Sequence, residues 1–176
     1  SGSSDVLQAL GVNVDLEPIK AKACLENTGF VFLFAPLYQP AFKQIAPVRQ
    51  ALKIRTLFNI MGPLLNPARV KRQVIGVYDQ RLLGIIAEAV LQLDNQRVMV
   101  VSSSDGMDEI SMAAPSHVRI VEGGVIRDLM IDPRDYGFAY CAPGDLLGGD
   151  AQQNANITRA VLAGERGPKT DCVVLN

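Results

Sequence analysis

Several residue types and patterns are scarce in this sequence of 176 residues, and each absence excludes a class of protein. The three cysteines, Cys24, Cys141 and Cys172, have no C-x-x-C spacing, so a disulfide scaffold is excluded and reduced thiols are expected. No apolar run approaches the roughly 18 residues of a membrane span. The first residues lack the basic region and apolar stretch of a secretory signal. We therefore expect a cytoplasmic protein without a membrane partner.

Aromatic residues and several well-known binding signatures are also missing or rare. Tryptophan is absent, aromatic residues make up 6% of the chain, and Lys and Arg form no cluster typical of nucleic-acid binding. The spacings G-x-S-x-G, G-x-G-x-x-G and G-x-x-x-x-G-K-[ST] do not occur, so triad hydrolases, dinucleotide enzymes and P-loop proteins lose support. No nucleic-acid partner is expected.

Acidic residues are missing from one long segment. Between Asn27 and Tyr78 there is no Asp or Glu, and seven Lys and Arg residues give this segment a formal charge of +7, against −8 for the rest of the chain. The division favours an anionic ligand or partner at the positive segment. A solvated basic face is the alternative explanation.

The residues that are present predict an α/β protein. Hydrophobic residues make up 48% of the chain, which is long enough to bury about 70% of its surface. A strand over residues 73–78, a helix over 81–93 and a strand over 97–101 form a predicted βαβ unit with parallel strands. Residues 118–121 and 125–131 predict a hairpin. We expect a mainly parallel or mixed central sheet flanked by helices.

Further elements are predicted before and after this unit. Ser3 or Ser4 is predicted to cap the first helix. The apolar run Phe30–Phe34, bounded by glycine and proline, predicts a strand covered on both faces. The other helices are predicted over residues 5–10, over 18–28, in two pieces broken by Pro40 and Pro47, over 55–61 and over 150–164 as the last helix.

Three groups of residues are suited to a phosphorylated ligand. Residues 1–5 begin a helix, where free N–H groups bind phosphate, although an ordinary helix cap has the same composition. Asp108 and Glu109 follow a buried strand, where adjacent carboxylates suit Mg²⁺, although a solvated acidic turn is the simpler alternative. Arg49 and Arg55 offer guanidinium forks for a carboxylate or phosphate, or else face water.

Several motifs occur in order along the whole chain. They are SGSSDVLQALG (residues 1–11), FNIMGPLLNPA (58–68), DGMDE (105–109), and GGDA (148–151) followed by Asn154-Ala155 and Gly164-Glu165. Taken together, these motifs resemble those of the anthranilate phosphoribosyltransferases, and the resemblance covers essentially the whole chain. The resemblance implies a nucleoside-phosphorylase-like catalytic domain and a homodimeric enzyme. It also implies transfer of the phosphoribosyl group from phosphoribosyl pyrophosphate to the amine of anthranilate, with Mg²⁺, in tryptophan biosynthesis.

The resemblance assigns roles to individual positions. The binding residues that it implies are Ser3 for phosphoribosyl pyrophosphate, Arg49 for anthranilate, Gly62 and Pro63 for a loop along the anthranilate path, and Asp108 and Glu109 for the metal. The chemistry of this transfer agrees with these roles: a metal held by the carboxylates would act as a Lewis acid on the leaving pyrophosphate, and no covalent catalytic nucleophile is needed or evident in the sequence.

The sequence also departs from the family pattern. The Gly-Thr-Gly-Gly-Asp loop and the Lys-His-Gly-Asn motif of the family are absent. Residues 1–176 are therefore expected to form an incomplete catalytic domain that lacks the N-terminal helical domain, the phosphate loop and C-terminal helices, and to be inactive alone. Gln39 replaces a common histidine, and Ser102 and Ser103 replace a common His-Gly pair.

Two alternative functions are considered. A pyrimidine nucleoside phosphorylase relative would share the fold, but the segment Phe58–Ala68 favours the transferase. A non-catalytic paralogue could bind nucleic acid through the basic segment. The pair Asp108 and Glu109 argues against this second alternative, since a nucleic-acid binder needs no metal pair.

Overall fold

The computed structural model describes residues 2–39 and 58–176. Their contacts divide the chain into two compact units. Unit 1 consists of Ser1–Pro67 and Gly148–Arg159, and unit 2 consists of Ala68–Leu147 and Ala160–Asn176. The sheet lies in unit 2.

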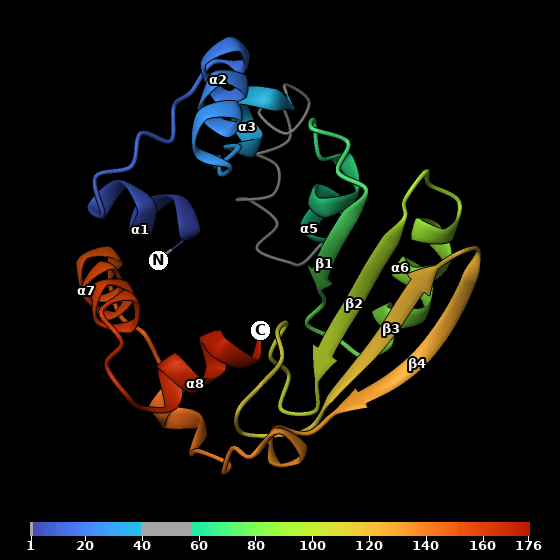
Figure 1. Ribbon diagram of the computed structural model, residues 1–176. Helices are drawn as coiled ribbons and strands as arrows, with labels where there is room; N and C mark the ends of the chain where they lie inside the picture. The colour runs from blue at the N-terminus through green and yellow to red at the C-terminus, as the bar shows by residue number, and fades with distance from the viewer. Residues whose placement is uncertain (1, 40–57) are drawn as a thin grey trace, which may run out of the picture. The chain divides into compact units, whose positions relative to one another are not determined.

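A four-stranded mixed sheet is the centre of unit 2, and its strands lie in the order β1-β2-β3-β4 (Figure 1). β1 (Arg72–Gly76) pairs in parallel with β2 (Arg97–Ser103). β3 (Ser116–Glu122) and β4 (Val125–Ile131) continue the sheet as an antiparallel hairpin. The predicted α/β class, parallel βαβ unit and hairpin are thereby confirmed.

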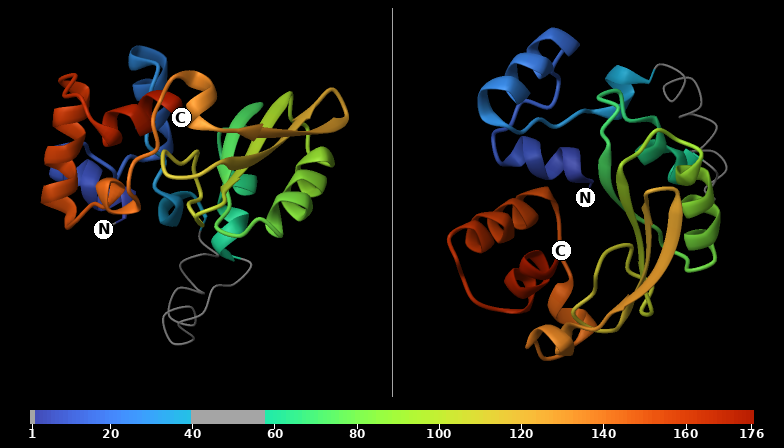
Figure 2. Two further views of the ribbon diagram at one scale, coloured as in Figure 1. Left: turned by 90° about the horizontal axis from the view of Figure 1, so that it is seen from below. Right: turned by 45° about the vertical axis from the view of Figure 1, so that its right-hand side comes forward.

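Helix α6 (Leu82–Leu91) connects the two parallel strands and covers one face of the sheet (Figure 2). Successive side chains of a strand point to opposite faces, so Val98 and Val100 share one face of β2. Both are fully buried, as are Ile86 and Ala87 of the helix. The apolar run of the helix and the β-branched run of the strand therefore form one layer of the core.

The opposite face of the sheet holds a second apolar cluster. Val101 of β2 and Val118 of β3 are paired across the strands and pack with Ile110. Leu175 packs against the same cluster from helix α8. The elements of unit 2 that follow β4 are η2 (Pro133–Tyr136), η3 (Pro143–Leu146) and α8 (Pro168–Leu175).

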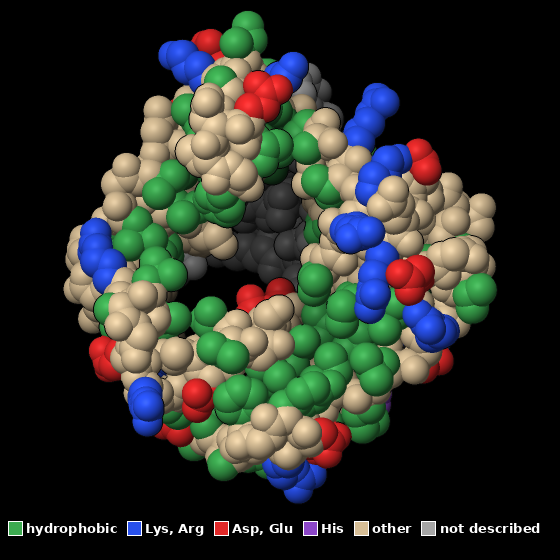
Figure 3. All heavy atoms as spheres, in the orientation of Figure 1, with side chains coloured by type: hydrophobic (Ala, Val, Ile, Leu, Met, Phe, Trp, Pro, Cys, Tyr) green, Lys and Arg blue, Asp and Glu red, His purple; other side chains and the backbone are tan. Residues whose placement is uncertain are grey.

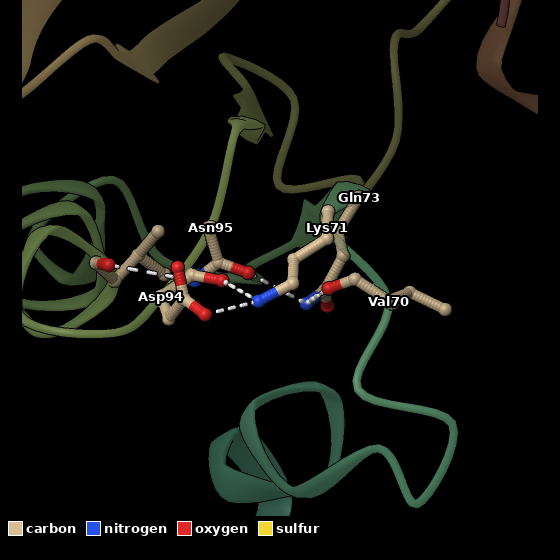
Figure 4. A network of polar contacts seen from close by, with 6 residues as sticks. Val70, Lys71, Gln73, Asp94 and Asn95 are labelled. Atoms are coloured by element: carbon tan, nitrogen blue, oxygen red, sulfur yellow. Dashed lines mark hydrogen bonds and ion pairs between the residues drawn. The ribbon is translucent and has the colours of Figure 1, made fainter.

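A polar network ties the turn after α6 to the start of β1 (Figure 4). Lys71 contacts Asp94 twice: Nζ donates to the backbone carbonyl at 2.8 Å and forms an ion pair with the carboxylate. Gln73 and Asn95 lie beside this pair, with Nε2 of Gln73 3.4 Å from Oδ1 of Asn95. The network fixes the end of the βαβ unit where β2 begins.

Unit 1 is helical within the described residues. Its elements are held by polar contacts between segments: Oη of Tyr38 donates to the carbonyl of Leu16 at 2.7 Å, and Nη2 of Arg159 donates to the carbonyl of Ala9 at 3.2 Å. The elements are α1 (Ser3–Ala9), α2 (Pro18–Thr28), α3 (Ala35–Tyr38), α5 (Phe58–Met61), η1 (Gly62–Leu65) and the first turns of α7 (Ala151–Leu162).

Three local predictions were wrong. Phe30–Phe34 forms no strand, and Phe30 is 62% exposed, because the described residues of unit 1 contain no strand that could pair with it. Gly2, rather than Ser3 or Ser4, precedes the first helix, and its N–H donates to Asp5 Oδ2 at 2.9 Å. The helix ending near Gly164 is followed by α8, whose N1 proline is Pro168.

Basic side chains with acidic ones among them lie over the strands of unit 2 (Figure 3). Glu122 accepts from Arg127 at 2.9 Å and lies 3.6 Å from Arg97. Exposed pairs of this kind contribute about 0–1 kcal/mol each.

The segment between Asn27 and Tyr78, which has no acidic residue, is described only in part. Its residue Lys71 forms an ion pair with Asp94, and residues 40–57 of the segment lie outside the described part of the chain. No described helix has the length and apolarity needed to cross a bilayer.

Candidate metal and substrate site

The acidic residues of the DGMDE motif lie in the loop that follows β2. The N–H of Gly106 donates to the carbonyl of Ser103 at 3.0 Å, and the N–H of Ser103 donates to the carbonyl of Met107 at 2.9 Å. Gly106 has a φ of 89°, a left-handed conformation that favours glycine. This closed turn presents Asp108 and Glu109 immediately after it.

Asp105 has a structural role in this turn. Its carboxylate accepts from Oγ of Ser111 at 2.6 Å and from the N–H of Met107 at 3.2 Å. Burial opposes ionisation, but the hydrogen bonds from Ser111 and Ser103 outweigh it and lower the pKa of Asp105. Its oxygens are therefore committed to the loop rather than to a ligand.

Asp108 and Glu109 line a cavity of about 520 Å³ that lies wholly within unit 2. Within the described part of the chain, neither carboxylate forms a hydrogen bond or an ion pair, and both residues are exposed. The remaining walls come from the strands and from α8, and include Gly76, Val101, Cys172 and Asn176.

The electrostatics of the pair favour a cation. The pKa of Glu109 is raised above its ordinary value, mainly by partial desolvation and to a smaller extent by the negative charge of Asp108. Two adjacent carboxylates of this kind are hard oxygen donors of the type that Mg²⁺ prefers. Among residues 2–39 and 58–176, no group of three or more His, Cys, Asp and Glu side chains could hold a metal. The donor set therefore fits an ion that keeps several waters or phosphate oxygens as ligands.

Gly76 allows the acidic turn to pack directly on β1. A Cβ at this position would lie 1.7 Å from the carbonyl oxygen of Asp108 and 2.9 Å from its carbonyl carbon. Real Cβ atoms essentially never approach other atoms within 3.0 Å. Only glycine therefore permits this approach, which fixes the height of Asp108 above the sheet.

The other predicted binding residues belong to unit 1, apart from one that is not described. Ser3 is exposed in the first turn of α1, and Gly62 and Pro63 are exposed at the start of η1. Arg49 lies outside the described residues. Asp108 and Glu109, which are adjacent in the sequence, thus line one cavity of unit 2, and Gly62 and Pro63 begin the 3-10 helix η1 of unit 1.

The positions that depart from the family pattern have identifiable surroundings. Nε2 of Gln39 donates to the carbonyl of Leu65 at 2.8 Å, so Gln39 holds the last residue of η1, the same helix that contains Gly62 and Pro63. Ser103 Oγ donates to the carbonyl of Pro115 at 3.3 Å. Ser102 Oγ is buried and has no hydrogen-bond partner among the described residues.

Sequence reasoning missed three residues of this cavity. Gly76 lies within the strand predicted over residues 73–78, where a single glycine gives no sign of a distant neighbour. Cys172 belongs to α8 and Asn176 follows its last residue; this helix was not predicted, although Gly167 followed by Pro168 is a typical helix start. The pKa of Cys172 is raised, mainly by burial and to a smaller extent by the negative charge of Glu109. Cys172 therefore presents a neutral thiol to the cavity.

Comparison with known proteins places this fold and loop in a family. A glycosyl transferase family, described by its a/b domain, matches residues 1–176, which is the whole chain. The chain belongs to this glycosyl transferase family. The matched residues include the sheet of unit 2 and the acidic turn that follows β2.

Two similar relatives of this glycosyl transferase domain carry the same name. The anthranilate phosphoribosyltransferase of Caldanaerobacter subterraneus is 49% identical over 176 residues, and that of Acetivibrio thermocellus is 46% identical. Each comparison covers 100% of this chain, with 52% of the first relative and 51% of the second. The chain thus spans about half the length of the curated relatives it matches.

Solved structures have the same fold. The anthranilate phosphoribosyltransferase of Thermus thermophilus matches with a TM-score of 0.84 and 37% identity, covering 98% of this chain and 51% of that one. The enzyme of Saccharomyces cerevisiae, solved in complex with PRPP and Mg, matches with a TM-score of 0.91. The yeast enzyme is 24% identical to this chain, and the match covers 99% of this chain and 51% of the yeast chain. At this identity the likeness shows a shared fold and no more.

Proposed function

We propose that the full-length protein transfers the phosphoribosyl group of phosphoribosyl pyrophosphate to the amine of anthranilate. The products are N-(5-phosphoribosyl)anthranilate and pyrophosphate, and the reaction belongs to tryptophan biosynthesis. The observation that carries the proposal is the adjacent carboxylates of Asp108 and Glu109, which have no partner among the described residues, at a cavity in a glycosyl transferase domain. The names of relatives at 46–49% identity support the choice of substrates.

Asp108 and Glu109 are the proposed ligands of Mg²⁺. The two carboxylates would hold and orient the cation, and a cation bound there would neutralise the charge on the leaving pyrophosphate. Gly76 and Asp105 keep the turn in place. The yeast structure in complex with PRPP and Mg supports this cofactor.

The remaining residues are proposed to bind substrate. Ser3 would donate a hydrogen bond to phosphoribosyl pyrophosphate, and Arg49 would hold the anthranilate carboxylate so that its amine faces the anomeric carbon. Gly62 and Pro63 would line the anthranilate path, with Gln39 holding their loop through Leu65. A yeast structure in complex with 4-fluoroanthranilate supports a site for the aromatic substrate.

The setting of the reaction is also proposed. Residues 1–176 would form most of one catalytic domain and be inactive alone, because the family's phosphate loop is absent from these residues. The full-length protein would be a cytoplasmic homodimer whose partners are its small-molecule substrates, without nucleic acid or membrane.

Loss of anthranilate fluorescence on addition of phosphoribosyl pyrophosphate tests the proposal in the full-length protein. Consumption should require Mg²⁺ and should be abolished by Asp108→Asn combined with Glu109→Gln. Asp128→Asn serves as a control, since Asp128 is exposed on β4 and pairs with Arg119. Phosphorolysis of pyrimidine nucleosides instead, or salt-dependent DNA binding without turnover, would replace this function with one of the alternatives.

A further inference from the structure

The side-chain amide of Asn176 pairs with the backbone of Ile110, the residue that follows Glu109. The N–H of Ile110 donates to Oδ1 of Asn176 at 2.9 Å, and Nδ2 of Asn176 donates to the carbonyl of Ile110 at 2.7 Å. The two residues are 66 positions apart in the sequence. Both backbone polar groups of Ile110 are thus satisfied by one side chain.

This pairing is anchored at both ends. Nδ2 of Asn176 also donates to the carbonyl of Cys172 at 2.9 Å, which ties the amide to α8. Ile110 is 6% exposed and belongs to the apolar cluster with Val101 and Leu175. The amide therefore connects the acidic loop to a helix whose last turn is packed on the core.

The chemistry of the pairing requires an amide. Asn offers a donor and an acceptor side by side, as a peptide group does, whereas a carboxylate offers only acceptors and alanine offers neither. Without the amide, the N–H of Ile110 loses this acceptor, and among the described residues its carbonyl keeps only the thiol of Cys172, at 3.7 Å.

The pairing lies next to the proposed metal ligands. The N–H of Ile110 belongs to the peptide bond that Glu109 begins, so fixing it limits rotation of the Glu109 backbone. Asn176 lines the same cavity as Asp108 and Glu109. On the other side of the pair, Gly76 supports the backbone of Asp108. The carboxylates are thus held from two directions.

We propose that Asn176 is a positioning residue that orients Glu109 for divalent-cation binding without contacting the ion. The inference rests on the proposed function only for the assignment of Asp108 and Glu109 as metal ligands. Groups that hold metal ligands in place typically contribute about 10- to 100-fold to metal affinity. Asn176 acts in this way through the peptide of Ile110.

The test measures Mn²⁺ binding by electron paramagnetic resonance in the full-length protein, in the presence of phosphoribosyl pyrophosphate and without anthranilate. Asn176→Ala should weaken Mn²⁺ binding about 10- to 100-fold. At saturating Mn²⁺, its KM for anthranilate should stay within about twofold of that of the wild type, because the anthranilate site is not altered. Asn176→Leu keeps the approximate size of the side chain, removes both hydrogen bonds and adds no charge to the cavity; it replaces the alanine variant if that variant does not fold, and it should weaken binding in the same direction.

Asn95→Ala is the matched control. Asn95 is also an asparagine of unit 2 that makes side-chain hydrogen bonds, to Gln73 and to the carbonyl of Val90, but it lies in the network of Figure 4 rather than at the cavity. Its loss should lower the melting temperature and leave Mn²⁺ affinity unchanged. If Asn176→Ala changes Mn²⁺ affinity no more than Asn95→Ala does, Asn176 does not position the ligands.

The same assay separates this inference from the proposed function. Asp108→Asn with Glu109→Gln should abolish specific Mn²⁺ binding. Retained binding in this double variant contradicts the metal site itself. Lost binding in the double variant, with wild-type binding in Asn176→Ala, contradicts only the role of Asn176.

Discussion

Substitution of Gly76 by alanine tests whether the acidic turn must rest on β1. The added Cβ would lie 1.7 Å from the carbonyl oxygen of Asp108, below the 3.0 Å limit of real Cβ contacts, so this peptide must move by roughly 1.3 Å. The obstructing atoms are backbone rather than the end of a flexible side chain. The Asp108 backbone, and Glu109 after it, must therefore shift away from the sheet.

Two magnitudes follow from this displacement. Overpacking of a well-packed region costs about 1–3 kcal/mol of stability. A misplacement of about 1 Å at a reacting centre costs about 10²-fold in rate. We therefore expect Gly76→Ala to lower Mg²⁺-dependent anthranilate consumption about 10²-fold, which is more than the loss of folded protein accounts for.

The assay is anthranilate fluorescence against Mg²⁺ concentration in the full-length protein, with thermal unfolding measured on the same samples. Gly144→Ala is the control, because a Cβ at Gly144 meets no atom within 4 Å. Full activity with an unchanged Mg²⁺ requirement in Gly76→Ala would refute the argument that close packing on β1 sets the position of the ligands.

Three further predictions concern single side chains. Because the pKa of Glu109 is raised above 4.5, protons compete with the cation at pH values where an ordinary glutamate is ionised. Mn²⁺ affinity should therefore fall as the pH is lowered through that raised pKa, and Glu109→Gln should remove this dependence in a calorimetric titration. Gln39→Ala removes the hydrogen bond to Leu65 and should raise the KM for anthranilate while leaving Mn²⁺ affinity unchanged in the same titration. Ser102→Ala removes a buried hydroxyl without a described partner, so chemical denaturation should show unchanged or greater stability, by up to about 1 kcal/mol.

Local sequence patterns were sufficient for the βαβ unit and the hairpin. Each of these elements has a signal that spans only a few neighbouring residues: an apolar β-branched run for a strand, an apolar stretch of suitable length for the helix, and glycine for a turn. All of these elements lie within unit 2. The run Phe30–Phe34 has a similar apolar composition but forms no strand, because a strand needs a hydrogen-bonding partner that a local pattern does not reveal. Apolar composition therefore predicted the core strands correctly only where a neighbouring strand was present.

The candidate site was predicted in part for the same reason. Asp108 and Glu109 were predicted as metal ligands because they are adjacent and follow a buried strand, and because the resemblance to the transferase family favoured this assignment over a solvated acidic turn. The contributions of Gly76 and Asn176 depend on contacts with residues 32 and 66 positions away, at Asp108 and Ile110. No periodicity or short motif carries information about such contacts, so only the structure identifies them.

The central claim is that the carboxylates of Asp108 and Glu109 hold the divalent cation that serves the departing pyrophosphate. The most direct measurement is the anomalous signal of Mn²⁺ in crystals of the full-length protein grown with phosphoribosyl pyrophosphate. The account predicts a peak within about 2–2.5 Å of an oxygen of Asp108 or Glu109, next to the pyrophosphate group. A peak at the pyrophosphate that is remote from both side chains would contradict it.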